Sequence, residues 1–118
     1  MLKKLLLTFS VVLFSFFNIS ITKADLLFPN NSILPADVIK IQLNALMDND
    51  GKFKDSGIEQ TWNFAHPNNK KNTGPLPNFK MMIKGNSYKM LLNHLSHTIT
   101  ALGSSNEWAQ FEVVILDK

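Results

Sequence analysis

The chain contains no cysteine, and this absence removes several classes of chemistry at once. Without thiols it can form no disulfide framework, no thiol redox centre and no cysteine-ligated zinc site. A lipid cannot be attached through a cysteine at a leader cleavage site either. A small domain without disulfides must be held together by its hydrophobic core or by a partner.

Arginine is also absent, so the 12 residues counted as lysine plus arginine are all lysines. They outnumber nine acidic residues, but Lys3, Lys4 and Lys23 all precede Asp25, the first acidic residue. From Asp25 onward the positive and negative charges are therefore balanced. A balanced chain without guanidinium groups, which bind phosphate in a bidentate manner, is not expected to bind nucleic acid.

The first 24 residues have the three parts of a secretory signal peptide. Lys3 and Lys4 form a positive start, residues 5–21 form an uncharged and mostly apolar run, and small residues flank Lys23 at the end. We predict cleavage after Ala24 and a periplasmic or secreted location. Contact with a membrane is then expected only transiently, through this leader.

Two alternatives to a cleaved leader follow from the same run of residues. A spanning helix needs about 20 predominantly apolar residues, whereas residues 5–21 are interrupted by serine, threonine and asparagine. An uncleaved membrane anchor stays open as an alternative. A core strand or helix is disfavoured, because no polar face recurs at either period.

The remainder predicts an extended leader over residues 25–33 and a single domain over residues 34–118. Pro35 is typical of a first helical position and predicts an amphipathic helix of about 13 residues. Ser56 and Glu59 form a capping-box pattern that predicts a second, short helix, ended by Pro67. We expect a polar loop over residues 66–73. A third helix is predicted to open at Gly74-Pro75 and close at Gly85, with a short helical piece over residues 87–93.

From Leu95 onward the hydrophobic period changes from helical to two, which predicts strands. Ile99 and Ala101 alternate with threonines, a turn is expected over residues 103–106, and alternate residues from Ala109 to Ile115 are apolar. Two strands are marginal on their own, and the sequence ends at Lys118, directly after the second. We therefore predict an α+β fold in which three to four helices pack on an antiparallel sheet that is incomplete at its C-terminal end.

Few motifs carry recognisable chemistry. Asp48, Asp50 and Glu59 have EF-hand-like spacing, but Phe53 occupies the position that requires glycine, so a calcium loop is excluded. The histidines lack a zinc-binding spacing, and no Gly-x-Ser-x-Gly nucleophile elbow is present. We predict no metal site and no cofactor. Hydrogen-bonded structural histidines are the default, with His94 as the first choice if one of them acts as an acid or base.

Several segments of the chain form a familiar set. They are Pro35-Ala36-Asp37-Val38-Ile39, Gln42-Leu43, Ala45-Leu46, Gly57-Ile58-Glu59, Trp62-Asn63-Phe64-Ala65, Pro67-Asn68-Asn69, Thr73-Gly74-Pro75-Leu76, Phe79, Tyr88 and Leu91-Leu92-Asn93-His94. Together they resemble the domain-of-unknown-function family 4864, from about residue 34 to residue 116. The resemblance implies an NTF2-like or cystatin-like cone, in which helices pack on a curved sheet. No activity or catalytic residue is attached to the family. Its members continue beyond the position of Lys118 and have a small residue in place of His66.

A cone of this kind encloses a pocket in many proteins, but the fold alone does not select a function. Large residues on the predicted helices are expected to form the core or to line such a pocket. The predicted pocket residues are Trp62, Phe79, Met82, Tyr88, Leu92 and His94. Our first hypothesis is a non-enzymatic module that binds a small apolar ligand or a protein partner. The alternatives are an isomerase or dehydratase that uses His94 or a pocket carboxylate, and a self-association module that forms a homodimer through its sheet edge.

Overall fold

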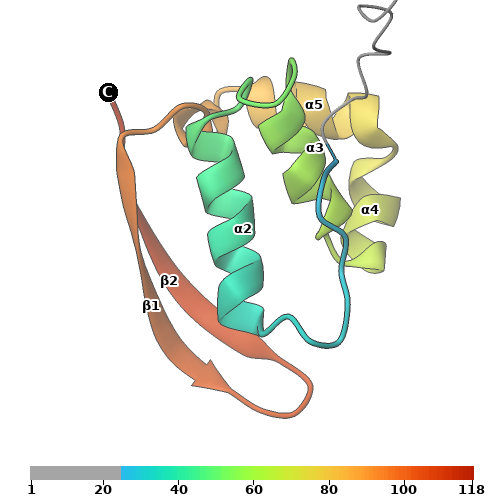
Figure 1. Ribbon diagram of the computed structural model, residues 1–118, viewed down its shortest axis with the longest axis vertical. Coiled ribbons are helices and arrows are strands. Elements are labelled where there is room, and N and C mark those ends of the chain that lie inside the picture. The colour runs from blue at the N-terminus through green and yellow to red at the C-terminus, as the bar shows by residue number, and fades with distance from the viewer. Residues whose placement is uncertain (1–24) are drawn as a thin grey trace, which may run out of the picture.

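Helices come first and a two-stranded antiparallel sheet comes last in the part of the chain that the structure describes (Figure 1). The computed structural model describes residues 25–118, so the predicted signal peptide lies outside the described residues. The elements are α2 (Pro35–Met47), α3 (Ser56–Asn63), α4 (Pro67–Thr73), α5 (Leu76–Lys84), the 3-10 helix η1 (Lys89–Leu91), β1 (Ser96–Ser104) and β2 (Ala109–Leu116). This is the predicted α+β class. None of the described helices is long and apolar enough to cross a membrane.

Helix α2 lies between the hairpin and the other helices (Figure 1). It has the predicted length of 13 residues, and Pro35 occupies its first turn. The sequence predicted one buried face, but α2 is covered on two sides. Leu43 is therefore buried together with Leu46.

Helix α3 begins at the predicted residue but not with the predicted cap. Asp55 precedes the helix with a φ of 60°, and its side chain does not cap the first turn. The hydroxyl of Ser56 instead donates to the Asn49 carbonyl oxygen at 3.1 Å. The capping-box prediction is therefore wrong, because Ser56 bonds to the preceding loop rather than to its own helix.

The polar loop predicted over residues 66–73 is wrong as well, since Pro67–Thr73 form helix α4. Pro67 was predicted only to end the preceding helix, α3. Proline is equally suited to a first helical position, and Nδ1 of His66 accepts a hydrogen bond from the Asn68 amide at 3.1 Å, which caps the new helix. Proline residues thus lie at the junctions between the three short helices α3, α4 and α5.

The C-terminal residues form the predicted hairpin. β1 and β2 pair in an antiparallel register from Ser96 opposite Leu116 to Ser104 opposite Ala109, so the turn lies slightly later than expected. Leu102 is an extra residue in β1, and the ladder shifts there. The face toward α2 is only partly covered, and Val113 on it remains 36% exposed.

The core lies among the helices and not on the sheet. Leu46 from α2, Ile58 from α3, and Phe79 and Ile83 from α5 form one buried cluster. Trp62, Leu76, Met82, Leu91 and Leu92 pack against it. The helices therefore support one another, and the hairpin is attached mainly along α2.

Candidate functional site

The residues predicted to line an apolar pocket are divided between the core and the surface. Phe79 is buried in the core cluster, and Trp62, Met82 and Leu92 pack against that cluster. Tyr88 points outward and is 43% exposed, contrary to its expected inward position. None of the six predicted residues lines either of the two hollows described below.

The sixth predicted residue, His94, belongs to a histidine pair. His94 is only 2% exposed, and its Nδ1 lies 2.6 Å from the carbonyl oxygen of Leu91. Its Nε2 lies 2.9 Å from Nδ1 of His97 on β1. Both ring nitrogens of His94 are therefore engaged, and neither is free to contact a substrate in this arrangement.

The geometry fixes the protons of the neutral pair. A carbonyl oxygen can only accept, so Nδ1 of His94 donates to Leu91 and its Nε2 must accept from Nδ1 of His97. If both rings were protonated, two N–H groups would point at each other. Burial, together with the charge of His94, lowers the pKa of His97 below its ordinary value of 6.5. His97 thus favours its neutral state in the folded protein.

We expect the free energy of unfolding to decrease as the pH falls below about 6.5, the ordinary pKa of histidine. Because the pKa of His97 is lowered in the folded state, the unfolded chain binds the proton more tightly. The contribution of His97 to the free energy of unfolding is complete above its pKa in the unfolded state. It is lost as the pH falls through its pKa in the folded state. Urea unfolding between about pH 7.5 and pH 5 measures this slope, which should be shallower in His97→Gln. The exposed His66→Gln serves as the control, and an equal slope in wild type and His97→Gln would contradict the prediction.

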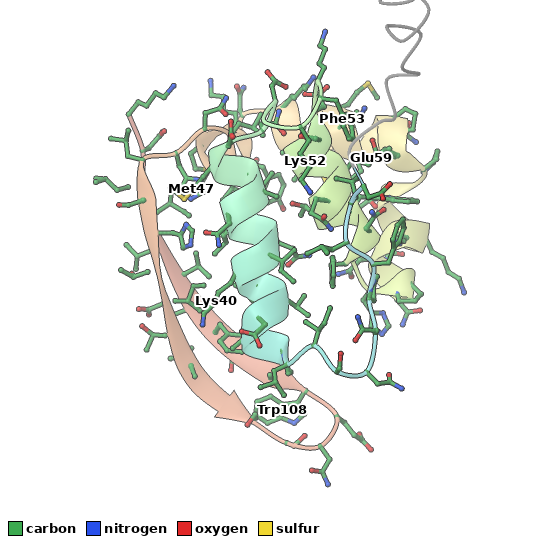
Figure 2. The ribbon with its side chains drawn as sticks, in the orientation of Figure 1. Lys40, Met47, Lys52, Phe53, Glu59 and Trp108 are labelled. Carbon is green, nitrogen blue, oxygen red and sulfur yellow. The ribbon has the colours of Figure 1, made fainter. Side chains whose placement is uncertain are left out.

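The first described residues form a strap over helix α3. We use this name for residues 25–28. The backbone N–H of Leu27 donates to Oε1 of Gln60 at 2.8 Å, and Nε2 of Gln60 donates back to the Leu27 carbonyl oxygen at 2.9 Å. Nζ of Lys52 donates to the carbonyl oxygen of Asp25 at 2.9 Å. Figure 2 shows Lys52 beside the start of the described chain. The buried side-chain amide of Gln60 therefore bonds to both backbone groups of Leu27, as the backbone of a neighbouring strand would.

Beneath the strap is a cleft of about 440 Å³ between α2 and α3. Leu26, Ile41 and Ala45 supply apolar lining, and Asp48 and Lys52 supply charges of opposite sign. This volume suits a small ligand. The cleft was not predicted from the sequence, because the bonds between Gln60 and the strap join residues 33 positions apart.

A second hollow, of about 420 Å³, lies where the start of α2 meets the turn end of the hairpin. Its lining is Leu34, Pro35, Ala36, Ala101, Leu102, Gly103, Ser104, Ala109 and Phe111. Trp108 lies at the same end of the hairpin, beyond the first turn of α2 (Figure 2). Leu102 and Trp108 are 57% and 56% exposed, respectively. Apolar side chains are thus concentrated at this end of the sheet.

Strand β1 has an unusual edge. Within residues 25–118 it pairs with β2 on one side only. Its residues, Ser96–Ser104, include no lysine, acidic residue or proline. Natural sheets protect such edges with charges, prolines or bulges. The bulge at Leu102 protects the last part of β1, but residues 96–101 remain neutral and regular.

Within the described residues, no group of three or more His, Asp or Glu side chains is placed to hold a metal ion. Comparisons of the chain with protein family models, with curated proteins and with solved structures find no match. The resemblance to the domain-of-unknown-function family 4864 stays a prediction. The candidate site therefore rests on the strap cleft and the open hairpin alone.

Proposed function

We propose that the protein is an exported binding module that completes its two-stranded sheet with β1 of a second copy. The observation that carries this proposal is the neutral, regular edge of β1 over residues 96–101, next to a sheet face that α2 covers only in part. A protein strand is favoured over a small apolar ligand, because the residues predicted to line an apolar pocket pack in the core or face solvent.

Symmetry favours β1 over β2 for this pairing. A two-fold axis through an antiparallel pair places each strand opposite its own copy. Residues close to the axis on one strand then face the same short stretch of residues on the other. In β1 that stretch presents Thr98 and Thr100, and cross-strand threonine pairs are favourable. In β2 it would bring the two Glu112 side chains toward each other, and like charges across strands are destabilising.

The pairing would also widen the sheet. A sheet extended from two strands to four is wide enough to be stable, whereas an isolated hairpin is marginal. The apolar face of each hairpin would then adjoin that of its partner.

The test is the mass in solution of the exported chain, measured by sedimentation over a range of concentrations. We expect a dimer whose chain begins at Asp25. Thr98→Lys combined with Thr100→Lys should give a monomer, because four lysines would then face one another across the two-fold axis.

The matched control places the same two charges in the turn, as Ser105→Lys with Asn106→Lys, and should leave the dimer intact. A wild-type chain that sediments as a monomer at every concentration contradicts the proposed function. Dissociation by the turn variant as strongly as by the strand variant would show that charge alone, and not the edge, is responsible.

A further inference from the structure

The charges of the described chain are separated along the sequence. Between Glu59 and Glu107 there is no acidic residue, but this stretch contains five lysines. It includes helices α4 and α5 and the 3-10 helix η1. The net balance noted for residues 25–118 therefore hides a strongly basic region, and electrostatic attraction depends on such local fields.

Three of these five lysines interact with other groups of the protein. Nζ of Lys84 lies 2.7 Å from Oδ2 of Asp55, and this hydrogen bond lowers the pKa of the Asp55 carboxyl despite its burial. Nζ of Lys70 lies 4.2 Å from the centre of the Trp62 ring. The positive charge of Lys80 also contributes to the lowered pKa of Asp55. Even with Asp55 included, the five lysines leave the region with an excess of positive charge.

Exposed apolar side chains alternate with the lysines at the end of α5 and in η1. Met81 is 71% exposed, Met90 is 44% exposed and Tyr88 is 43% exposed. They are neighbours of Lys80 and Lys89 in sequence, and α5 packs against η1. We call Lys80, Met81, Lys84, Tyr88, Lys89 and Met90 the basic–apolar patch.

We propose that the basic–apolar patch docks the protein on the surface of a lipid bilayer that contains anionic headgroups. Lysine ammonium groups are attracted to such a surface, while long methionine side chains and a tyrosine ring enter the boundary between headgroups and acyl chains. The lysine stems can lie along the same apolar boundary with their charges outward. A nucleic acid does not suit the patch, because the chain has no arginine.

This peripheral contact differs from the transient contact expected of the leader, and it is independent of the sheet edge. Helix α5 lies at the end of the molecule opposite the hairpin turn (Figure 1). A protein docked through the patch therefore leaves the turn end of the hairpin directed away from the bilayer. Failure of the dimer test and failure of a lipid test are separate outcomes.

The test is co-sedimentation of the exported chain with vesicles of phosphatidylcholine alone or mixed with phosphatidylglycerol. We expect binding to the mixed vesicles only. The double variant Lys80→Gln with Lys89→Gln should bind about 25-fold more weakly, from about fivefold per lysine near an anionic surface. Raising the salt from about 0.1 M to about 1 M, which shortens the screening length from about 10 Å to about 3 Å, should abolish binding.

Two controls test whether binding depends on the patch itself or on charge and apolar surface anywhere in the protein. Lys40→Gln with Lys118→Gln removes the same charge elsewhere and should leave binding unchanged. Met81→Ser should weaken binding about tenfold through lost apolar burial, whereas Leu34→Ser, which changes a similarly exposed residue at the start of α2, should not. Equal binding to both vesicle types, equal loss in the two lysine variants, or no binding at all would overturn the proposal.

Discussion

Replacing Gly57 with alanine is expected to lower the free energy of unfolding by about 3 kcal/mol, at the upper end of the usual cost of overpacking. Gly57 lies where α3 crosses α2, and a Cβ atom there would overlap the carbonyl oxygen of Ala45 and lie 2.9 Å from Cα of Asn49. Both contacts are with backbone, so no side-chain rotation can relieve them. The two helices would have to separate.

The sign of this change is informative, because helix propensity alone predicts the opposite. Alanine is favoured over glycine by about 1 kcal/mol inside a helix. Urea unfolding of Gly57→Ala therefore distinguishes the two effects. Gly103→Ala is the matched control, since its Cβ would make an ordinary contact of 3.5 Å with the Trp108 ring. A stability gain in Gly57→Ala would show that α2 and α3 do not approach as closely as described.

Truncating Ile58 to alanine is expected to cost about 4 kcal/mol, within the range for fully buried aliphatic residues. Ile58 has no exposed surface and belongs to the core cluster shared by α2, α3 and α5. Its amide donates to Oδ1 of Asn49 at 3.0 Å, and the amide of Gly57 donates to the Asn49 carbonyl oxygen at 2.8 Å. This anchoring prevents the backbone from closing the cavity.

The matched control for Ile58→Ala is Ile39→Ala, because Ile39 is only partly buried in α2. Ile39→Ala should lower the free energy of unfolding by only about 1 kcal/mol, because Ile39 buries less apolar area than Ile58. Urea unfolding measures both variants at neutral pH. Similar losses for the two isoleucines would contradict a core centred on α3.

The sequence predicted those parts of the fold that depend on local pattern. Pro35 and the spacing of apolar residues defined α2, and the alternation from Ala109 to Ile115 identified β2 with its inward face. The errors occurred where one residue type has two roles. Pro67 ends one helix and begins the next, and Ser56 bonds to the Asn49 loop instead of capping α3.

The candidate site was predicted less well, because its features depend on distant contacts. Trp62 and Phe79 were identified as large inward residues, but whether such residues line a pocket or fill a core depends on how wide the sheet is. The bond between Gln60 and Leu27 joins residues 33 positions apart, and no local pattern encodes it. The neutral edge of β1 was readable in the sequence once the strand itself was recognised.

The extra residue Leu102 in β1 has a consequence for the behaviour of this protein at high concentration. An uninterrupted neutral edge would specify its pairing register only weakly, since neither charges nor an irregularity would mark one alignment of two copies. Because the bulge bends the strand, only its first part can be copied in register. Deleting Leu102 would straighten the edge, and two copies would then pair in several registers instead of one.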